Sequence, residues 1–357
     1  MSAFLNKFLL GSSNSERPQI YLSAFGKHPG WNDHVEEIGI ETETLAICRS
    51  TFYVQAIGGM INSGRWDKIE ESEEGLDFDH LFLWHRVDEF LFGIMWPSKD
   101  GKGRKKYPMI VCAHCVGIPL SWALTHVLPK LNEVKELCIN TESASIVRST
   151  LSGTRNSLRS KLKEQPPNSE AIVPLPNNID ALINHPAFEP QRQGLIRVLY
   201  QFSNQFSIYG LGLYNLKTLM HHQGQGDHIR FPLAAGSPEE SIALWVPFLR
   251  TQIDPQVPLL FITPRREDCD WCDAILGEVT HQSLLCLKVS TQSLPLASEI
   301  PYSLSPEFLT DSNTILDNLV EDNMKSLTNI FKSSQVRVQK ESAFGKTSFL
   351  RRLFSKK

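Results

Sequence analysis

Three apolar segments in close succession, the last two separated by a turn-rich connection, constrain the fold more than any other feature of this sequence. Residues 81–84, 90–96 and 107–116 are rich in large apolar residues and have the length of β-strands. The connection at 97–104 reads Pro-Ser-Lys-Asp-Gly-Lys-Gly-Arg, and its proline, glycines and aspartate favour a turn. We therefore expect residues 90–96 and 107–116 to pair as a hairpin.

Other periodic segments predict helices and strands on either side of this hairpin. Apolar residues at three- and four-residue spacing predict helices at 43–61, 121–137, 179–206 and 239–253, with a kink or break at Pro129. Further strands are predicted at 20–25, 229–234, 257–263 and 283–289. Together these segments predict an α/β (α+β) fold, with a mixed β-sheet flanked by helices and two lobes.

A proline-rich stretch at 163–178 divides the chain into two parts. We expect the following organisation: a flexible segment at 1–18, an α/β domain at 19–162, a linker at 163–178, a second α/β lobe at 179–305, and a helical, basic tail at 306–357.

Composition excludes several classes of protein. The chain has 357 residues, is 41% hydrophobic and carries a net charge of −3, which argues against a disordered chain and against nucleic-acid binding. No apolar run reaches the length of a membrane-spanning helix. Seven cysteines, with no export signal, favour a reducing compartment over a disulfide framework. We therefore expect a cytoplasmic protein.

The C-terminal tail differs from the rest of the chain in charge. Residues 331–357 hold eight lysines and arginines but one glutamate, and phenylalanines and leucines recur there at helical spacing. A basic amphipathic segment of this kind suits weak contact with an anionic membrane surface or a partner's groove. The other interpretation is a solvated tail.

The sequence contains no complete nucleotide-binding loop and no nucleophile elbow of a serine hydrolase. The pairs Gly101/Gly103 and Gly224/Gly226 lack the third glycine of a dinucleotide-binding loop, and no Gly-x-Ser-x-Gly elbow is present. Lys346 follows a glycine as in a phosphate-binding loop, but the earlier glycine of that motif is absent. We expect no enzymatic activity and no cofactor.

Two Cys-x-x-Cys pairs leave a zinc site, structural or catalytic, as the alternative function. Cys112 and Cys115, with His114 between them, lie in a predicted strand, and Cys269 and Cys272 lie more than 150 residues later. Residues three apart in a strand point to opposite faces, so the first pair cannot close on one ion without a local turn. We expect buried, apolar cysteines and no metal.

Two loops have a composition typical of binding sites. Residues 26–33 read Gly-Lys-His-Pro-Gly-Trp-Asn-Asp, and residues 99–106 hold five cations in eight positions. Restricted loops often bind partners, and a basic loop suits an acidic surface or a phosphate. The alternative is a structural role, in which the aspartates and Ser98 cap the turns.

Together the two loops resemble the TagF family, accessory proteins of bacterial type VI secretion. The resemblance covers about residues 20–130 and depends on the sequences at 25–35 and 93–109, the second with Pro-Ser-x-Asp and Gly-Arg in order between two strands. It implies a non-enzymatic, post-translational repressor of secretion-system assembly. The implied partner is a protein of that machinery, a forkhead-associated scaffold or a component of its threonine-kinase pathway.

The resemblance also implies a set of site residues. Those expected to form a binding surface are Lys27, Asp33, Ser98, Asp100 and Arg104. Those expected to shape the loops are Gly26, Pro29, Gly103 and Pro108.

Overall fold

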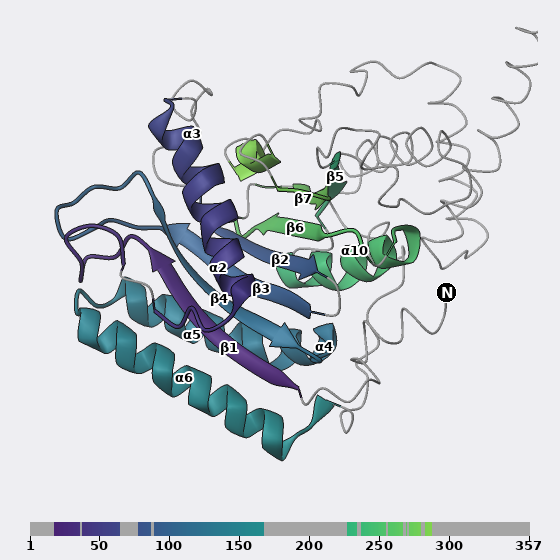
Figure 1. Cartoon of the computed structure of the whole chain (residues 1–357), viewed down its shortest axis with the longest axis horizontal. Coiled ribbons are helices and arrows are strands. Elements are labelled where there is room, and N and C mark those ends of the chain that lie inside the picture. The colour runs from purple at the N-terminus through teal and green to yellow at the C-terminus, as the bar shows by residue number, and fades with distance from the viewer. Residues whose placement is uncertain are drawn as a thin grey trace, which may run out of the picture.

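The computed structural model describes residues 18–35, 38–64, 78–86, 89–167, 227–233, 237–254, 256–266, 269, 271–279 and 283–287. Seven strands in these ranges form one sheet in the order β1-β4-β3-β2-β6-β7-β5 (Figure 1). They are β1 (Gln19–Gly26), β2 (His80–Arg86), β3 (Glu89–Pro97), β4 (Pro108–Val116), β5 (Asp227–Pro232), β6 (Leu259–Pro264) and β7 (Trp271–Leu276).

Helices cover both faces of the sheet. One face packs against a continuous helix made of α2 (Glu43–Cys48), the π-helical segment η1 (Arg49–Gly58) and α3 (Gly59–Asn62), together with the short 3₁₀ helix η5 (Ser283–Leu287). The other face packs against α4 (Leu120–Trp122), the π-helical segment η3 (Ala123–Val127), α5 (Leu128–Ile139), α6 (Ala144–Glu164) and α10 (Pro238–Gln252). The result is a three-layer α+β arrangement, as predicted (Figure 1).

Burial on both faces explains why the central strands are almost wholly apolar. Along β2, Leu81 and Leu83 belong to the hydrophobic core on one face, and Phe82 and Trp84 belong to the core on the other. A strand with one solvated face would alternate apolar and polar residues, whereas these strands need apolar side chains at successive positions.

The sheet differs from the predicted mixed sheet because every strand pair among the described residues is antiparallel. For β2 with β3, β3 with β4, and β6 with β7, the connections are too short for the crossover that parallel pairing requires. In addition, β2 pairs with β6 in the register His80↔Pro264 to His85↔Leu259. The two expected lobes therefore share one continuous sheet.

Most predicted elements are confirmed to within a few residues. This is true of the strands at 20–25, 81–84, 90–96, 107–116, 229–234 and 257–263, and of the helices at 43–61, 121–137 and 239–253. Pro129 lies at the start of α5, directly after the π-helical η3, so the expected irregularity occurs just before the proline.

One predicted element was wrong, and two elements were not predicted. The predicted strand at 283–289 is the 3₁₀ helix η5, while β7 and the 21-residue helix α6 were not predicted. The helix α6 also extends into the expected linker, as far as Glu164. The predicted helical stretch at 179–206, the basic tail, residues 1–17 and residues 168–178 lie outside the described residues.

Within the described ranges, no helix combines the length and apolar character needed to cross a membrane.

Candidate functional site

The two loops singled out in the sequence meet where β1 ends. Gly26, the last residue of β1, has φ of +121°, and a Cβ there would lie 2.2 Å from the carbonyl oxygen of Pro108. The backbone N–H of Lys27 donates to that same oxygen at 3.0 Å, and Gly101 N–H donates to the carbonyl of Trp31 at 2.7 Å. The expected loop-shaping roles of Gly26 and Pro108 thus correspond to one close backbone contact.

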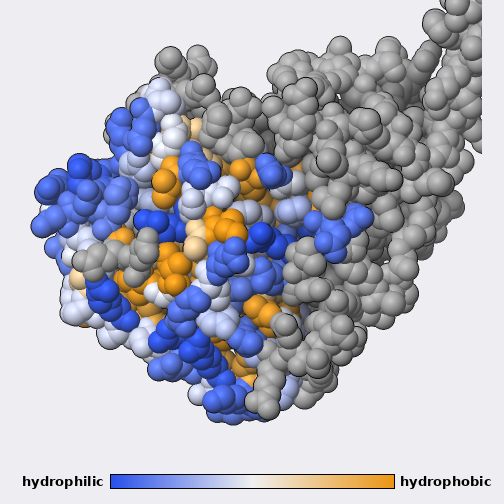
Figure 2. Space-filling view, viewed as in Figure 1, coloured by the Kyte–Doolittle hydropathy of each residue, from blue (hydrophilic) through white to orange (hydrophobic). Residues whose placement is uncertain are grey.

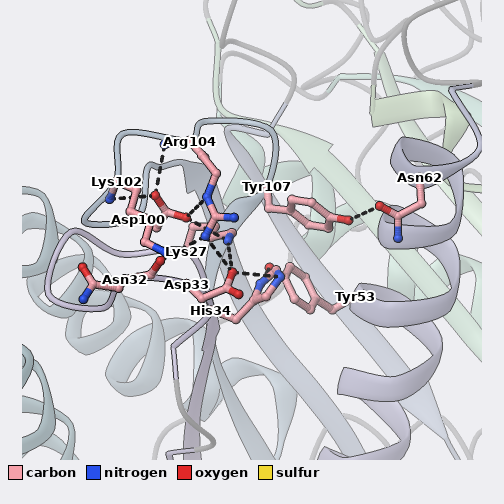
Figure 3. Close-up of polar contacts among 10 residues, drawn as sticks. All are labelled: Lys27, Asn32, Asp33, His34, Tyr53, Asn62, Asp100, Lys102, Arg104 and Tyr107. Atoms are coloured by element: carbon pink, nitrogen blue, oxygen red, sulfur yellow. Dashed lines mark hydrogen bonds and ion pairs between the residues drawn. The ribbon is translucent and has the colours of Figure 1, made fainter.

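Four charged side chains from these loops form one cluster (Figure 3). The Lys27 ammonium donates to Asp33 Oδ1 at 2.6 Å and to Asp100 Oδ2 at 3.0 Å. The Arg104 guanidinium donates through Nε to Asp100 Oδ2 at 2.7 Å and through Nη2 to Asp33 Oδ1 at 3.1 Å. Each cation therefore contacts both carboxylates. We call Lys27, Asp33, Asp100 and Arg104 the ion cluster.

The ion cluster has a buried half and an accessible half. The side chains of Lys27 and Asp100 are 4% and 0% exposed, whereas those of Asp33 and Arg104 are 67% and 52% exposed. A partner could touch Asp33 and Arg104 directly. It could reach Lys27 only if Asp33 moved.

Asp100 caps its own turn. Its Oδ1 accepts the backbone N–H groups of Lys102 and Arg104, each at 3.0 Å, and its carbonyl accepts from Gly103, which has φ of +78°. Burial alone would raise the pKa of Asp100, but hydrogen bonds from Arg104, Lys27 and Lys102 outweigh it and hold this pKa well below the ordinary value. Asp100 therefore has the turn-capping role that was the alternative to binding.

Asp33 is held differently. The hydrogen bond from Lys27 is the largest cause that lowers its pKa, and the charge of Arg104 adds to the effect. The hydrogen bonds shown for its carboxylate come from side chains rather than from backbone N–H groups. Asp33 is therefore an ionised, exposed carboxylate fixed by two cations.

The side chains of His34, Tyr53 and Tyr107 border the ion cluster, and we call them the aromatic wall. His34 Nδ1 and the Tyr53 hydroxyl are 2.8 Å apart, and the His34 ring packs edge-on against Tyr53 and Tyr107. The Tyr107 hydroxyl donates to Asn62 Oδ1 at 2.9 Å, and Lys27 Nζ lies 5.9 Å from the centre of the Tyr107 ring. Burial raises the pKa of Tyr53 and lowers that of His34.

Sequence reasoning missed this wall. Tyr53 and Asn62 belong to the helix at 43–62, which was predicted only for its apolar face. The one available signal was Tyr107, which directly precedes the predicted strand and the loop-shaping Pro108.

The remaining predicted residues have smaller roles. Ser98 is half-buried at the end of β3, and no hydrogen bond within the described part of the chain joins it to the ion cluster. The carbonyl oxygen of Pro29 would lie 2.9 Å from a Cβ on Gly101, so the two loops approach closely there. Of the five predicted binding residues, the structure thus brings four together and leaves Ser98 beside them.

The cysteine pairs do not converge on one ion. As predicted, Cys112 and Cys115 lie on opposite faces of β4, one in each hydrophobic core. Cys272 is on β7, four strand spacings from β4, which corresponds to roughly 19 Å. The described residues contain no group of three or more His, Cys, Asp or Glu side chains arranged to hold a metal ion.

No family model, curated protein or solved structure matches this chain. The geometry of the ion cluster and the resemblance carried by the two loops are therefore the observations that bear on function.

Proposed function

We propose that this protein is a non-enzymatic, cytoplasmic repressor of type VI secretion, similar in role to the TagF family. It acts by binding a protein of the secretion machinery, either a forkhead-associated scaffold or a component of the kinase pathway. The observation that carries the proposal is the meeting of the two family-like loops, since Lys27 and Asp100 lie 73 positions apart in sequence and 3.0 Å apart in space.

The surface around the ion cluster suits recognition of a protein. Within the connection between β3 and β4, the side chains of Lys99, Lys102, Arg104, Lys105 and Lys106 are exposed. Figure 2 shows a hydrophilic surface at the left of the view, where Figure 1 draws this connection. An exposed, positively charged loop fixed at its base provides charge complementarity for an acidic partner.

The charges of the ion cluster favour binding over acid–base catalysis. The pKa values of Asp33 and Asp100 are both below the ordinary value for an aspartate. A general base works best with a pKa near the working pH, and these carboxylates are displaced in the opposite direction. Their hydrogen bonds to Lys27 and Arg104 instead keep both carboxylates ionised.

A secretion assay in the native host tests the proposal. We expect deletion of the gene to raise type VI secretion and overproduction to lower it. Arg104→Ala should restore repression poorly, whereas Lys130→Ala, which removes another exposed cation on α5, should restore it fully. Unchanged secretion after both deletion and overproduction would contradict the repressor role.

An affinity pull-down with mass spectrometry identifies the partner. We expect a scaffold or kinase-pathway protein to be recovered with the wild-type chain and with Lys130→Ala, and to be depleted with Arg104→Ala. Because Lys27 is buried beside Asp100, a Lys27 variant would mix loss of binding with loss of stability, so the exposed Arg104 is the better probe. Equal recovery with both variants would place the binding surface elsewhere.

A further inference from the structure

We propose that the Asp33 carboxylate occupies the position of a ligand, and that an acidic side chain of a protein partner displaces it to bind Lys27 and Arg104. This inference rests on the proposed protein-binding function and specifies the chemistry of the contact. It treats Asp33 as a displaceable group and Asp100 as a permanent part of the loop.

The two carboxylates of the ion cluster are held unequally. Asp100 is buried and receives two backbone N–H groups in addition to Lys27 and Arg104. Asp33 is 67% exposed and is held by the same two cations. The Asp33–Arg104 pair is exposed on both sides, and such pairs add little to stability because solvent competes for both charges. Lys27 is buried, but an incoming carboxylate would take the place of Asp33 beside it and keep its charge compensated.

Both cations would keep their positions after Asp33 left. Arg104 would still donate to Asp100 Oδ2 at 2.7 Å and to the Asn32 carbonyl at 3.0 Å, and Lys27 would still donate to Asp100 at 3.0 Å. A partner would therefore meet donors that are already oriented, and this preorganisation reduces the entropy lost on binding.

The donors converge on a single point. Lys27 Nζ and Arg104 Nη2 both contact the same oxygen, Asp33 Oδ1, at 2.6 Å and 3.1 Å. An incoming carboxylate can place one oxygen at that point and extend its chain outward through the exposed side now filled by Asp33. Charge-assisted hydrogen bonds to two cations make this a favoured position for a carboxylate.

The surrounding loop would attract an acidic segment. Four exposed lysines, Lys99, Lys102, Lys105 and Lys106, lie on the same connection as Arg104. The one acidic residue of that connection, Asp100, is neutralised internally by Lys27 and Arg104. The net positive field steers acidic chains toward the ion cluster and weakens as salt is added.

A fluorescence anisotropy titration of the full chain with a labelled octaglutamate peptide tests the inference. Asp33→Asn removes the competing carboxylate. The matched control is Glu133→Gln, which also removes one exposed negative charge paired with a lysine, Lys130, on the helix α5. We expect Asp33→Asn to tighten peptide binding about fivefold, and Glu133→Gln to change it by less than about twofold.

A second substitution tests whether Arg104 binds the incoming carboxylate. In the Asp33→Asn background, Arg104→Gln should abolish the gain, while Lys130→Gln should keep it. Equal effects of Asp33→Asn and Glu133→Gln would overturn displacement in favour of a general field, and weaker binding by Asp33→Asn would overturn it as well. Thermal unfolding of each variant checks that it is folded.

The experiments distinguish a failure of the displacement inference from a failure of the proposed function. Loss of partner capture by Arg104→Ala with no peptide effect of Asp33→Asn would remove the displacement and leave the protein-binding role. A peptide effect combined with unchanged secretion in the deletion strain would keep the displacement and remove the repressor role.

Discussion

The ammonium of Lys27 lies 3.0 Å from Oδ2 of Asp100, and both side chains are buried beneath the more exposed Asp33 and Arg104. The Lys27–Asp100 ion pair links the end of β1 to the connection between β3 and β4. The site therefore has a structural base and an accessible rim. Substitutions in these two parts should have different consequences.

Lys27→Met should destabilise the fold, because it leaves the buried Asp100 carboxylate without one of its two cations. Lys130→Met removes an exposed cation paired with Glu133 and should change stability little. We expect a clear fall in the midpoint of thermal unfolding for Lys27→Met alone. Similar midpoints for the two variants would show that the Lys27–Asp100 pair does not fasten the loops.

Two glycines should respond oppositely to alanine. Gly26 has φ of +121° and a Cβ there would lie 2.2 Å from a backbone oxygen, so Gly26→Ala should cost roughly 1–3 kcal/mol or more. Gly153, in the helix α6, has no atom within 4 Å of a Cβ, and Gly153→Ala should stabilise by about 0.5–1 kcal/mol. Urea unfolding of both variants measures these changes, and a neutral Gly26→Ala would contradict the backbone contact.

The sequence was sufficient to predict six of the seven strands in the described part of the sheet and the hairpin of β3 with β4, but not the long-range pairing. Strands such as β3 and β4 were found because burial on both faces requires a run of apolar residues. The pairing of β2 with β6 joins residues that are more than 170 positions apart, and local pattern contains no information about it. The strand β7 was missed because its Trp-Cys-Asp-Ala-Ile-Leu sequence places Asp273 among apolar residues.

The candidate site could be predicted in part. Glycines, prolines and charges mark the two loops, and the residues of the ion cluster were implied by the family resemblance that these loops carry. The division into a buried pair and an exposed pair could not be predicted, since burial depends on how the two loops pack together. The aromatic wall could not be predicted for the same reason. Tyr53 comes from a helix whose sequence pattern predicts only its apolar face.

The cysteines should behave as buried apolar residues. Burial raises the pKa of Cys115 and brings that of Cys138 to about 12, so neither thiol forms the reactive thiolate at neutral pH. We expect all seven cysteines, each of which is buried, to react with a thiol reagent slowly in the native protein and rapidly in urea.

The same cysteines give an expected result for zinc. Because Cys112 and Cys115 lie in different cores, protein purified without chelator should contain less than about 0.2 equivalents of zinc. Elemental analysis measures this directly, with chelator-treated protein as the control. One equivalent of zinc that is lost in a Cys112→Ser variant would contradict the placement.

Stability should fall in acid because of His80. Burial lowers the pKa of this histidine from 6.5 to about 4, although Asp79 and Asp273 act in the opposite direction. Between these values the unfolded chain binds a proton that the folded chain excludes, so stability decreases as pH falls from 6.5 toward 4. The loss from this residue is about 3 kcal/mol. His80→Gln, which does not titrate, should therefore show a shallower decline in the free energy of unfolding, measured in urea at pH values across this window. Parallel curves for wild type and His80→Gln would show that His80 is not a buried neutral group, whereas converging curves toward low pH would establish it as one.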